Sequence, residues 1–213
     1  MIPLRDTIPS NSTAWVTRFL VAANIAMFAL ELSQGKHLER FVERFGVIPA
    51  EWNLPTLLTS QFLHGGFAHL IGNMMYLWIF GDNVEDRLGH WRFLCLYLTS
   101  GIVAAIAQIV MMPHSTMPMV GASGAIAGIL GAYFLLFPSA RIVTLVPFGL
   151  FLQTVELPAF LFLFIWFLMQ WASGLMSIGQ VADVGGVAFW AHIGGFITGL
   201  IGIAILRPQR RWS

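Results

Sequence analysis

Two short motifs contain side chains that could carry out catalysis together. Ser123 lies in a Gly-Ala-Ser-Gly sequence, and His192 lies in an Ala-His-Ile-Gly-Gly sequence. A hydroxyl and an imidazole are the two parts of the simplest serine nucleophile and base. Both motifs lie within apolar runs, and polar side chains inside a membrane are costly and usually functional. The sequence therefore predicts nucleophilic chemistry within a lipid bilayer.

The composition is that of a membrane protein. Hydrophobic residues make up 57% of the chain and charged residues 10%, with a mean hydropathy of +0.77. Soluble domains carry about 25% charged residues. The net charge of +1 and the lack of a basic run with interleaved aromatic residues give no indication of nucleic-acid binding. We therefore expect a polytopic membrane protein whose partners are membrane lipids and membrane proteins.

The apolar runs predict an all-α fold with six transmembrane helices. No Asp, Glu, Lys or Arg occurs between Arg92 and Arg141, a stretch long enough for two spans of about 20 residues. Pro113 and His114 mark the break between these two spans. The other four runs are 15–32, 65–81, about 157–176 and 185–206. We expect one helical domain over 15–206, with a tail at 1–14 and a basic tail at 207–213.

The basic residues predict the orientation. Six spans place both termini on one side, together with most of the arginines, whereas the opposite side has only Lys36, Arg40 and Arg44. Loops rich in Lys and Arg stay in the cytoplasm. Both termini are therefore expected on the cytoplasmic side of a cell membrane. The second, fourth and sixth helices then begin at the external or periplasmic face.

The polar residues cluster at the start of those three helices. Ser123 is expected about six residues into the fourth helix and His192 about seven into the sixth, so both would lie on the order of 10 Å below the surface. His69 and Asn73 are four residues apart near the start of the second helix and share one helix face. His64 points away and is expected to support the helix entrance.

Small residues on the fourth and sixth helices predict close packing. Glycines recur at spacings of three or four on both helices, and such stripes let membrane helices approach closely. The residues are Gly121, Gly124, Gly128 and Gly131 in the fourth helix, and Ala191, Gly195 and Gly199 in the sixth. We expect Gly195 and Gly199 to act as structural supports that bring His192 near Ser123.

Taken together, these residues resemble the rhomboid family of intramembrane serine proteases. The similarity covers nearly the whole chain from His37 to Leu206 and includes the serine and histidine motifs, the two histidines and asparagine of the second helix, and Glu85, Gly89 and Arg92 after it. It implies a rhomboid-like helical bundle. Some family members have a tyrosine four residues after the serine, against the imidazole, where this chain has Ala127.

The resemblance also implies a role for each site residue. Ser123 would be the nucleophile and His192 the general base, while His69, Asn73 and the backbone of the Gly121–Ser123 segment would stabilise an oxyanion. No carboxylate is expected to orient His192, because Asp183, nine residues before it, would lie roughly 13 Å away along a helix. We therefore expect a Ser-His dyad that uses no metal and no cofactor.

The expected function is endopeptidase cleavage of single-pass transmembrane proteins in or near their spanning helix. The alternative is a non-catalytic rhomboid-like protein that binds or escorts membrane clients, because a fold does not establish an activity. A small-solute channel or transporter is a third reading. A metalloprotease is disfavoured because no His-Glu-x-x-His motif occurs, and an aspartyl protease because no aspartate lies within a span.

Overall fold

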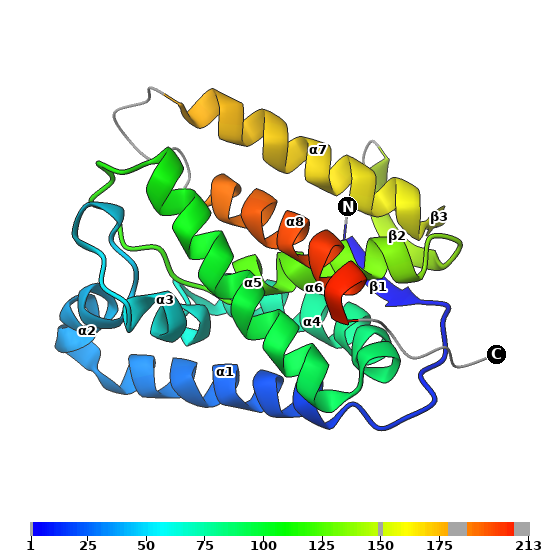
Figure 1. Cartoon of the computed structure of the whole chain (residues 1–213), viewed down its shortest axis with the longest axis horizontal. Coiled ribbons are helices and arrows are strands. Elements are labelled where there is room, and N and C mark those ends of the chain that lie inside the picture. The colour runs from blue at the N-terminus through cyan, green and yellow to red at the C-terminus, as the bar shows by residue number, and fades with distance from the viewer. Residues whose placement is uncertain (1, 149–150, 179–186, 207–213) are drawn as a thin grey trace.

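The computed structural model describes residues 2–148, 151–178 and 187–206, and the long helices in it run side by side as a bundle (Figure 1). The predicted all-α helical bundle is confirmed. The predicted tail at 207–213 and Asp183 lie outside the described residues. The long helices are α1 (Trp15–Ser33), α4 (Phe67–Leu88), α5 (His90–Met111), α6 (Ser123–Leu136), α7 (Ala159–Ser177) and α8 (Phe189–Leu206).

Four of these helices, α1, α5, α7 and α8, are long and apolar enough to cross a membrane. α4 is 22 residues long, but its last two turns carry Asp82, Glu85, Asp86 and Arg87. α6 has only 14 residues. The number of six spans therefore stays a prediction.

α4 continues well beyond the predicted end at Gly81 because its last turns bind the start of α1. The buried Glu85 carboxylate accepts hydrogen bonds from the backbone N–H groups of Val16 (2.9 Å) and Thr17 (2.7 Å) and from the Thr17 hydroxyl (2.7 Å). N–H groups in the first turn of a helix lack intrahelical acceptors, so this carboxylate caps α1 and fixes it to α4.

α6 and α8 pack with their backbones almost in contact, as the glycine spacing predicts. A Cβ on Gly195 would lie 2.0 Å from the carbonyl oxygen of Gly124, and a Cβ on Gly199 would lie 1.9 Å from that of Gly128. No larger residue fits at these positions without separating the helices. The glycines thus set the distance between the two helices that carry Ser123 and His192.

Short helices fill the connection between α1 and α4. They are η1 (Gly35–His37), α2 (Leu38–Phe45), η2 (Pro49–Glu51), α3 (Thr56–Thr59) and η3 (Ser60–Phe62). They gather at one end of the bundle (Figure 1). Near that end, the buried Glu31 carboxylate of α1 accepts hydrogen bonds from the backbone N–H of His64 (3.0 and 3.1 Å), which anchors the segment that leads into α4.

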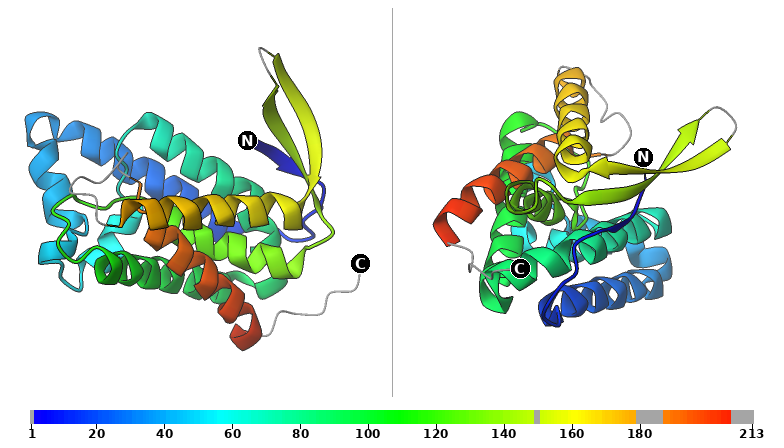
Figure 2. Two further views of the ribbon diagram at one scale, coloured as in Figure 1. Left: turned by 90° about the horizontal axis from the view of Figure 1, so that it is seen from above. Right: turned by 90° about the vertical axis from the view of Figure 1, so that its right-hand side faces the viewer.

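The opposite end carries a small antiparallel sheet that the sequence analysis did not anticipate. Its strands β1 (Ile2–Asp6), β2 (Arg141–Phe148) and β3 (Phe151–Pro158) lie in the order β1-β2-β3. β2 and β3 form a hairpin that projects from the bundle (Figure 2). On β1, the Asp6 carboxylate accepts hydrogen bonds from the Tyr133 hydroxyl (2.6 Å) and the Asn83 amide (2.7 Å), so the sheet is joined to α6 and α4.

Candidate active site

Ser123 is the first residue of α6, rather than about six residues into it as the sequence analysis expected. The segment before it is extended, and Met119 forms a bridge with Val47. Gly121 then has a φ of +124°, which favours glycine, and donates its backbone N–H to the Ser60 carbonyl (2.9 Å). The helix starts only after this turn. As the first helical residue, Ser123 has a backbone N–H without an intrahelical acceptor.

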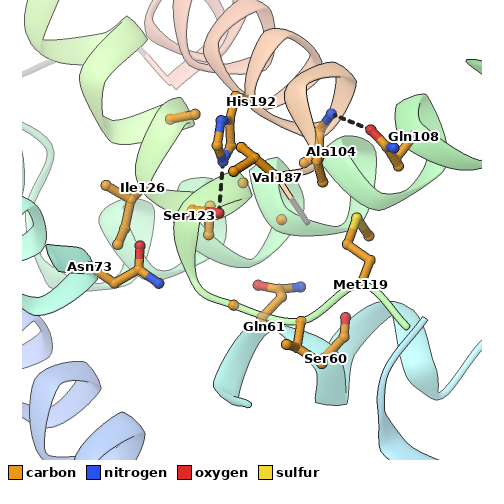
Figure 3. A pocket seen from close by; sticks show the side chains of 18 of the residues that line it. Ser60, Gln61, Asn73, Ala104, Gln108, Met119, Ser123, Ile126, Val187 and His192 are labelled. Carbon is orange, nitrogen blue, oxygen red and sulfur yellow. Dashed lines mark hydrogen bonds between the residues drawn. The ribbon is translucent and has the colours of Figure 1, made fainter. Parts of the chain in front are cut away.

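His192 lies in the first turn of α8 and points at Ser123 (Figure 3). Its Nε2 is 2.8 Å from the Ser123 Oγ, although the two residues are 69 positions apart in the chain. This is the distance at which an imidazole can accept the hydroxyl proton of a nucleophile. The two predicted catalytic side chains therefore meet in one place, at the start of two closely packed helices.

The other ring nitrogen of His192 is held by a residue that sequence reasoning missed. Nδ1 lies 2.7 Å from Oε1 of Gln170 in α7. The ring centroid of Trp166, one helical turn before Gln170 in α7, lies 5.8 Å from that of His192. Because Ala127 stands where some family members have a tyrosine against the imidazole, the contacts that orient the His192 ring come from α7 instead. Gln170 is the only amide in the apolar sequence of α7, and this could have been the signal.

α5 fixes the first turn of α8 from its other side. The side-chain Oε1 of Gln108 accepts a hydrogen bond from the backbone N–H of Ala191, the neighbour of His192 (3.3 Å). Two residues after His192, Gly194 packs closely on α5, because a Cβ on Gly194 would lie 2.6 Å from the Cβ of Ala107. The backbone beneath the imidazole is therefore held by a buried hydrogen bond and by close packing.

His69 and Asn73 line the same cavity as Ser123 and His192. A Cβ on Gly121 would lie 2.7 Å from Nε2 of His69 and 3.5 Å from Nδ2 of Asn73, so both side chains approach the turn before Ser123. Asn73 Nδ2 is buried and has no hydrogen-bond partner in the described part of the chain. A buried amide donor without a partner is costly and suggests a ligand. The Gly121 N–H, in contrast, is already bonded to Ser60.

The cavity has a volume of about 780 Å³ and is bounded by α4, α5, α6, α7 and the start of α8. Asn73, Gln61 and Ser60 surround Ser123 in this cavity (Figure 3). Its lining also includes Tyr76 of α4, Ile126 and Leu130 of α6 and Trp166 of α7. A mostly apolar cavity with a few convergent polar groups is typical of a binding site. Among the described residues, no group of three or more His, Cys, Asp or Glu side chains could hold a metal ion.

His64 does not line this cavity. Its ring packs against Phe28 and His69, with ring centroids 6.4 and 5.3 Å away. Burial, and then the neighbouring His69, lowers the pKa of His64 to about 4. A neutral, buried ring between α1 and α4 fits the expected supporting role.

Comparison with known proteins places the chain in a family. The model of the rhomboid domain matches residues 51–209. The chain belongs to the rhomboid family. Among curated proteins, the rhomboid protease GluP of Bacillus subtilis is 33% identical over 203 residues, which cover 92% of this chain and 36% of GluP. The mitochondrial rhomboid protein 1 of Saccharomyces cerevisiae is 29% identical over 193 residues, which cover 85% of this chain and 50% of the yeast protein.

A shorter match is closer in sequence. The putative rhomboid protease YdcA of Bacillus subtilis is 43% identical over 88 residues, or 41% of this chain and 43% of YdcA. This rhomboid thus spans about a third to a half of the length of these relatives. It is a multi-pass membrane protein, and its family includes intramembrane serine proteases.

Proposed function

We propose that this rhomboid is an intramembrane serine endopeptidase with a Ser-His dyad. The observation that carries the proposal is the 2.8 Å contact between Ser123 Oγ and His192 Nε2 inside a cavity between membrane helices. A protein that only binds or escorts clients has no need for a hydroxyl aligned with an imidazole, whose far nitrogen is itself held by Gln170.

The first half of the reaction forms an acyl-enzyme. Ser123 Oγ attacks the carbonyl carbon of the scissile peptide bond while His192 Nε2 takes the hydroxyl proton. The carbonyl oxygen becomes an oxyanion, which the Ser123 backbone N–H, Asn73 Nδ2 and His69 can stabilise by donating hydrogen bonds. When the tetrahedral intermediate collapses, the C–N bond breaks and the imidazolium of His192 gives its proton to the leaving amine.

The second half uses water. His192 removes a proton from a water molecule that attacks the ester carbonyl, and the collapse of the second tetrahedral intermediate returns the proton to Ser123 Oγ and releases the new carboxyl group. No cofactor or metal takes part in this scheme.

The proposed substrates are single-pass transmembrane proteins. An intact helix hides its backbone carbonyls in hydrogen bonds, so a substrate must unwind locally before its peptide bond reaches Ser123. The wall of the cavity between α4 and α7 offers an apolar surface for such a segment. From the distribution of Arg and Lys, we propose that both termini are cytoplasmic and that the site opens to the external or periplasmic side.

The decisive experiment is labelling with a serine-directed fluorophosphonate in detergent. The parent protein should be labelled, and Ser123→Ala should not. Ser100→Ala, which removes another buried serine of the bundle, is the matched control and should be labelled like the parent. Equal labelling of the parent and Ser123→Ala would favour the non-catalytic alternative.

A further inference from the structure

The hairpin of β2 and β3 projects from the bundle and has an exposed outer strand (Figure 2). It leaves the bundle beside α7 at a large angle to the helices and extends outward, past the surface of the bundle (Figure 2). Every residue of β3 from Phe151 to Glu156 is exposed. At about 3.3 Å per residue, Phe151 lies roughly 20 Å along the strand from Leu157. Among the described residues, the side chains of β3 from Phe151 to Glu156 are therefore largely uncovered by protein.

The register of the sheet divides the hairpin into two faces, because side chains alternate along a strand and paired residues share a face. One face we call the bundle-side face, since its base packs on the helices. Ile142 is fully buried in the main core, and its partner Leu157 packs against that core. Asp6, the partner of Ile142 on β1, reaches Tyr133 and Asn83 from the same face. Farther out, this face carries Val146, Phe151, Gln153 and Val155.

The opposite, outer face carries charges only at its base, and farther out it carries Leu145, Pro147, Leu152 and Thr154. Arg141 and Glu156 lie on it, and so does Arg5 of β1, which pairs with Val143. All three are exposed. From Ile142 to Val155 the sequence contains no charged residue. The charges of the hairpin are thus confined to the base of its outer face, and beyond them both faces are uncharged.

We propose that the hairpin lies along the membrane surface, with its bundle-side face on the lipids of the leaflet at this end of the helices. Phe151, 75% exposed, and Val155, 37% exposed, would be in contact with lipid in this position. The same orientation leaves Arg5, Arg141 and Glu156 in water. Exposed apolar side chains on an uncharged segment, with charged residues at its base, fit the boundary between lipid and water.

The connection to α7 further favours a lipid partner. β3 runs directly into α7, whose exposed Phe160 and Phe164 continue the apolar surface into the span. β3 is an edge strand of the sheet among the described residues, and backbone N–H and C=O groups left unpaired at such an edge cannot be buried in hydrocarbon. The interface satisfies both conditions, since headgroups and water can bind the edge while apolar side chains contact the lipid.

The test compares two neighbouring exposed positions with opposite expected surroundings. Single cysteines replace Gln153 (bundle-side face) and Thr154 (outer face) in a Cys95→Ala background, because Cys95 is the only cysteine of the chain. Each single-cysteine protein is labelled with a nitroxide spin label and reconstituted into liposomes for the measurement. We expect the label at 153 to collide more often with oxygen than with a water-soluble nickel complex, and the label at 154 to show the reverse. Phe151→Cys and Leu152→Cys form a second pair with the same expectation.

The other outcomes would overturn the proposal. High nickel accessibility at both 153 and 154 would mean that the hairpin projects into water. Low accessibility of both positions to both reagents would mean that a protein, such as a second copy pairing with the β3 edge, covers the hairpin. Labels at Met111, at the end of α5, and at Lys36, in the short helix η1, give reference values. The readout is independent of any catalytic activity.

Discussion

His192 Nδ1 and Gln170 Oε1 lie 2.7 Å apart, and this contact determines how the imidazole faces Ser123. A neutral imidazole has one N–H donor and one acceptor nitrogen. Because the amide oxygen of Gln170 accepts the proton of Nδ1, Nε2 is left with a lone pair directed at the Ser123 hydroxyl, 2.8 Å away. The amide thus takes the orienting position that a carboxylate occupies in a triad, but without a negative charge.

The first prediction tests this positioning role. Gln170→Leu should lower kcat by about 10- to 100-fold with little change in KM, because the ring loses its orientation while the substrate surface is kept. Gln170→Glu keeps the acceptor and adds a charge that stabilises the imidazolium, so it should retain activity and move the acidic limb of the pH–rate profile to higher pH. The measurement is cleavage of a single-span reporter in proteoliposomes between pH 5 and 9.

A purely structural role for Gln170 would give a different pattern. In that case Gln170→Leu would lower thermal stability and activity together, and Gln170→Glu would leave the pH profile unchanged.

The second prediction concerns the dyad as a unit. Ser123→Ala and His192→Ala should each abolish cleavage of the reporter, and the double variant should be no worse than either single one, since residues that act as one unit are not additive. Size-exclusion elution and thermal unfolding in detergent establish that each variant is folded. Substantial turnover in a folded single variant would contradict the proposed mechanism.

The third prediction tests the unpaired amide of Asn73. Asn73→Ala should lower kcat by roughly 10- to 1,000-fold with a small effect on KM, because a donor to the oxyanion acts mainly as charge develops. Asn24→Ala is the matched control. Its amide donates to the Leu20 carbonyl within α1, away from the cavity. If Asn73→Ala were as active as the parent, the oxyanion would have to be stabilised by other groups.

The fourth prediction uses the lowered pKa of His64. The unfolded chain takes up a proton at an ordinary histidine pKa near 6.5, whereas the folded protein does so only near pH 4. Between these values the unfolded state binds more protons, so the free energy of unfolding should fall as the pH drops from 6.5 to 4, by at most about 3 kcal/mol from this residue. Thermal unfolding of the parent in detergent should show this loss.

The control for His64 is His64→Gln, which cannot titrate. Its stability should fall less steeply over the same pH range. Asp6, whose pKa burial raises to about 6, has the opposite pH dependence, but it is present in both proteins and cancels in the comparison. Identical slopes in the two proteins would show that His64 is not a neutral, buried ring in the folded state.

The sequence by itself determined the bundle and the identity of several side chains at the site. Uncharged apolar runs must lie in lipid and must satisfy their backbone internally, so they predict helices. Glycines at spacings of three and four on α6 and α8 predict a close approach, and a Cβ at Gly195 or Gly199 would indeed meet the backbone of α6. Periodicity and composition are local properties, and they are therefore visible in one dimension.

Only the tertiary structure placed Gln170 against His192, because the two residues come from different helices and no spacing rule relates them. It also decided that α6 begins at Ser123, where the turn at Gly121 is held by Ser60 and faced by His69. The hairpin went unpredicted because the mostly apolar run from Ile142 to Val155 has no period that separates a strand from a helix. The strand conformation of this segment depends on pairing with β1 and on the packing of Ile142 into the core, which are contacts between distant parts of the chain.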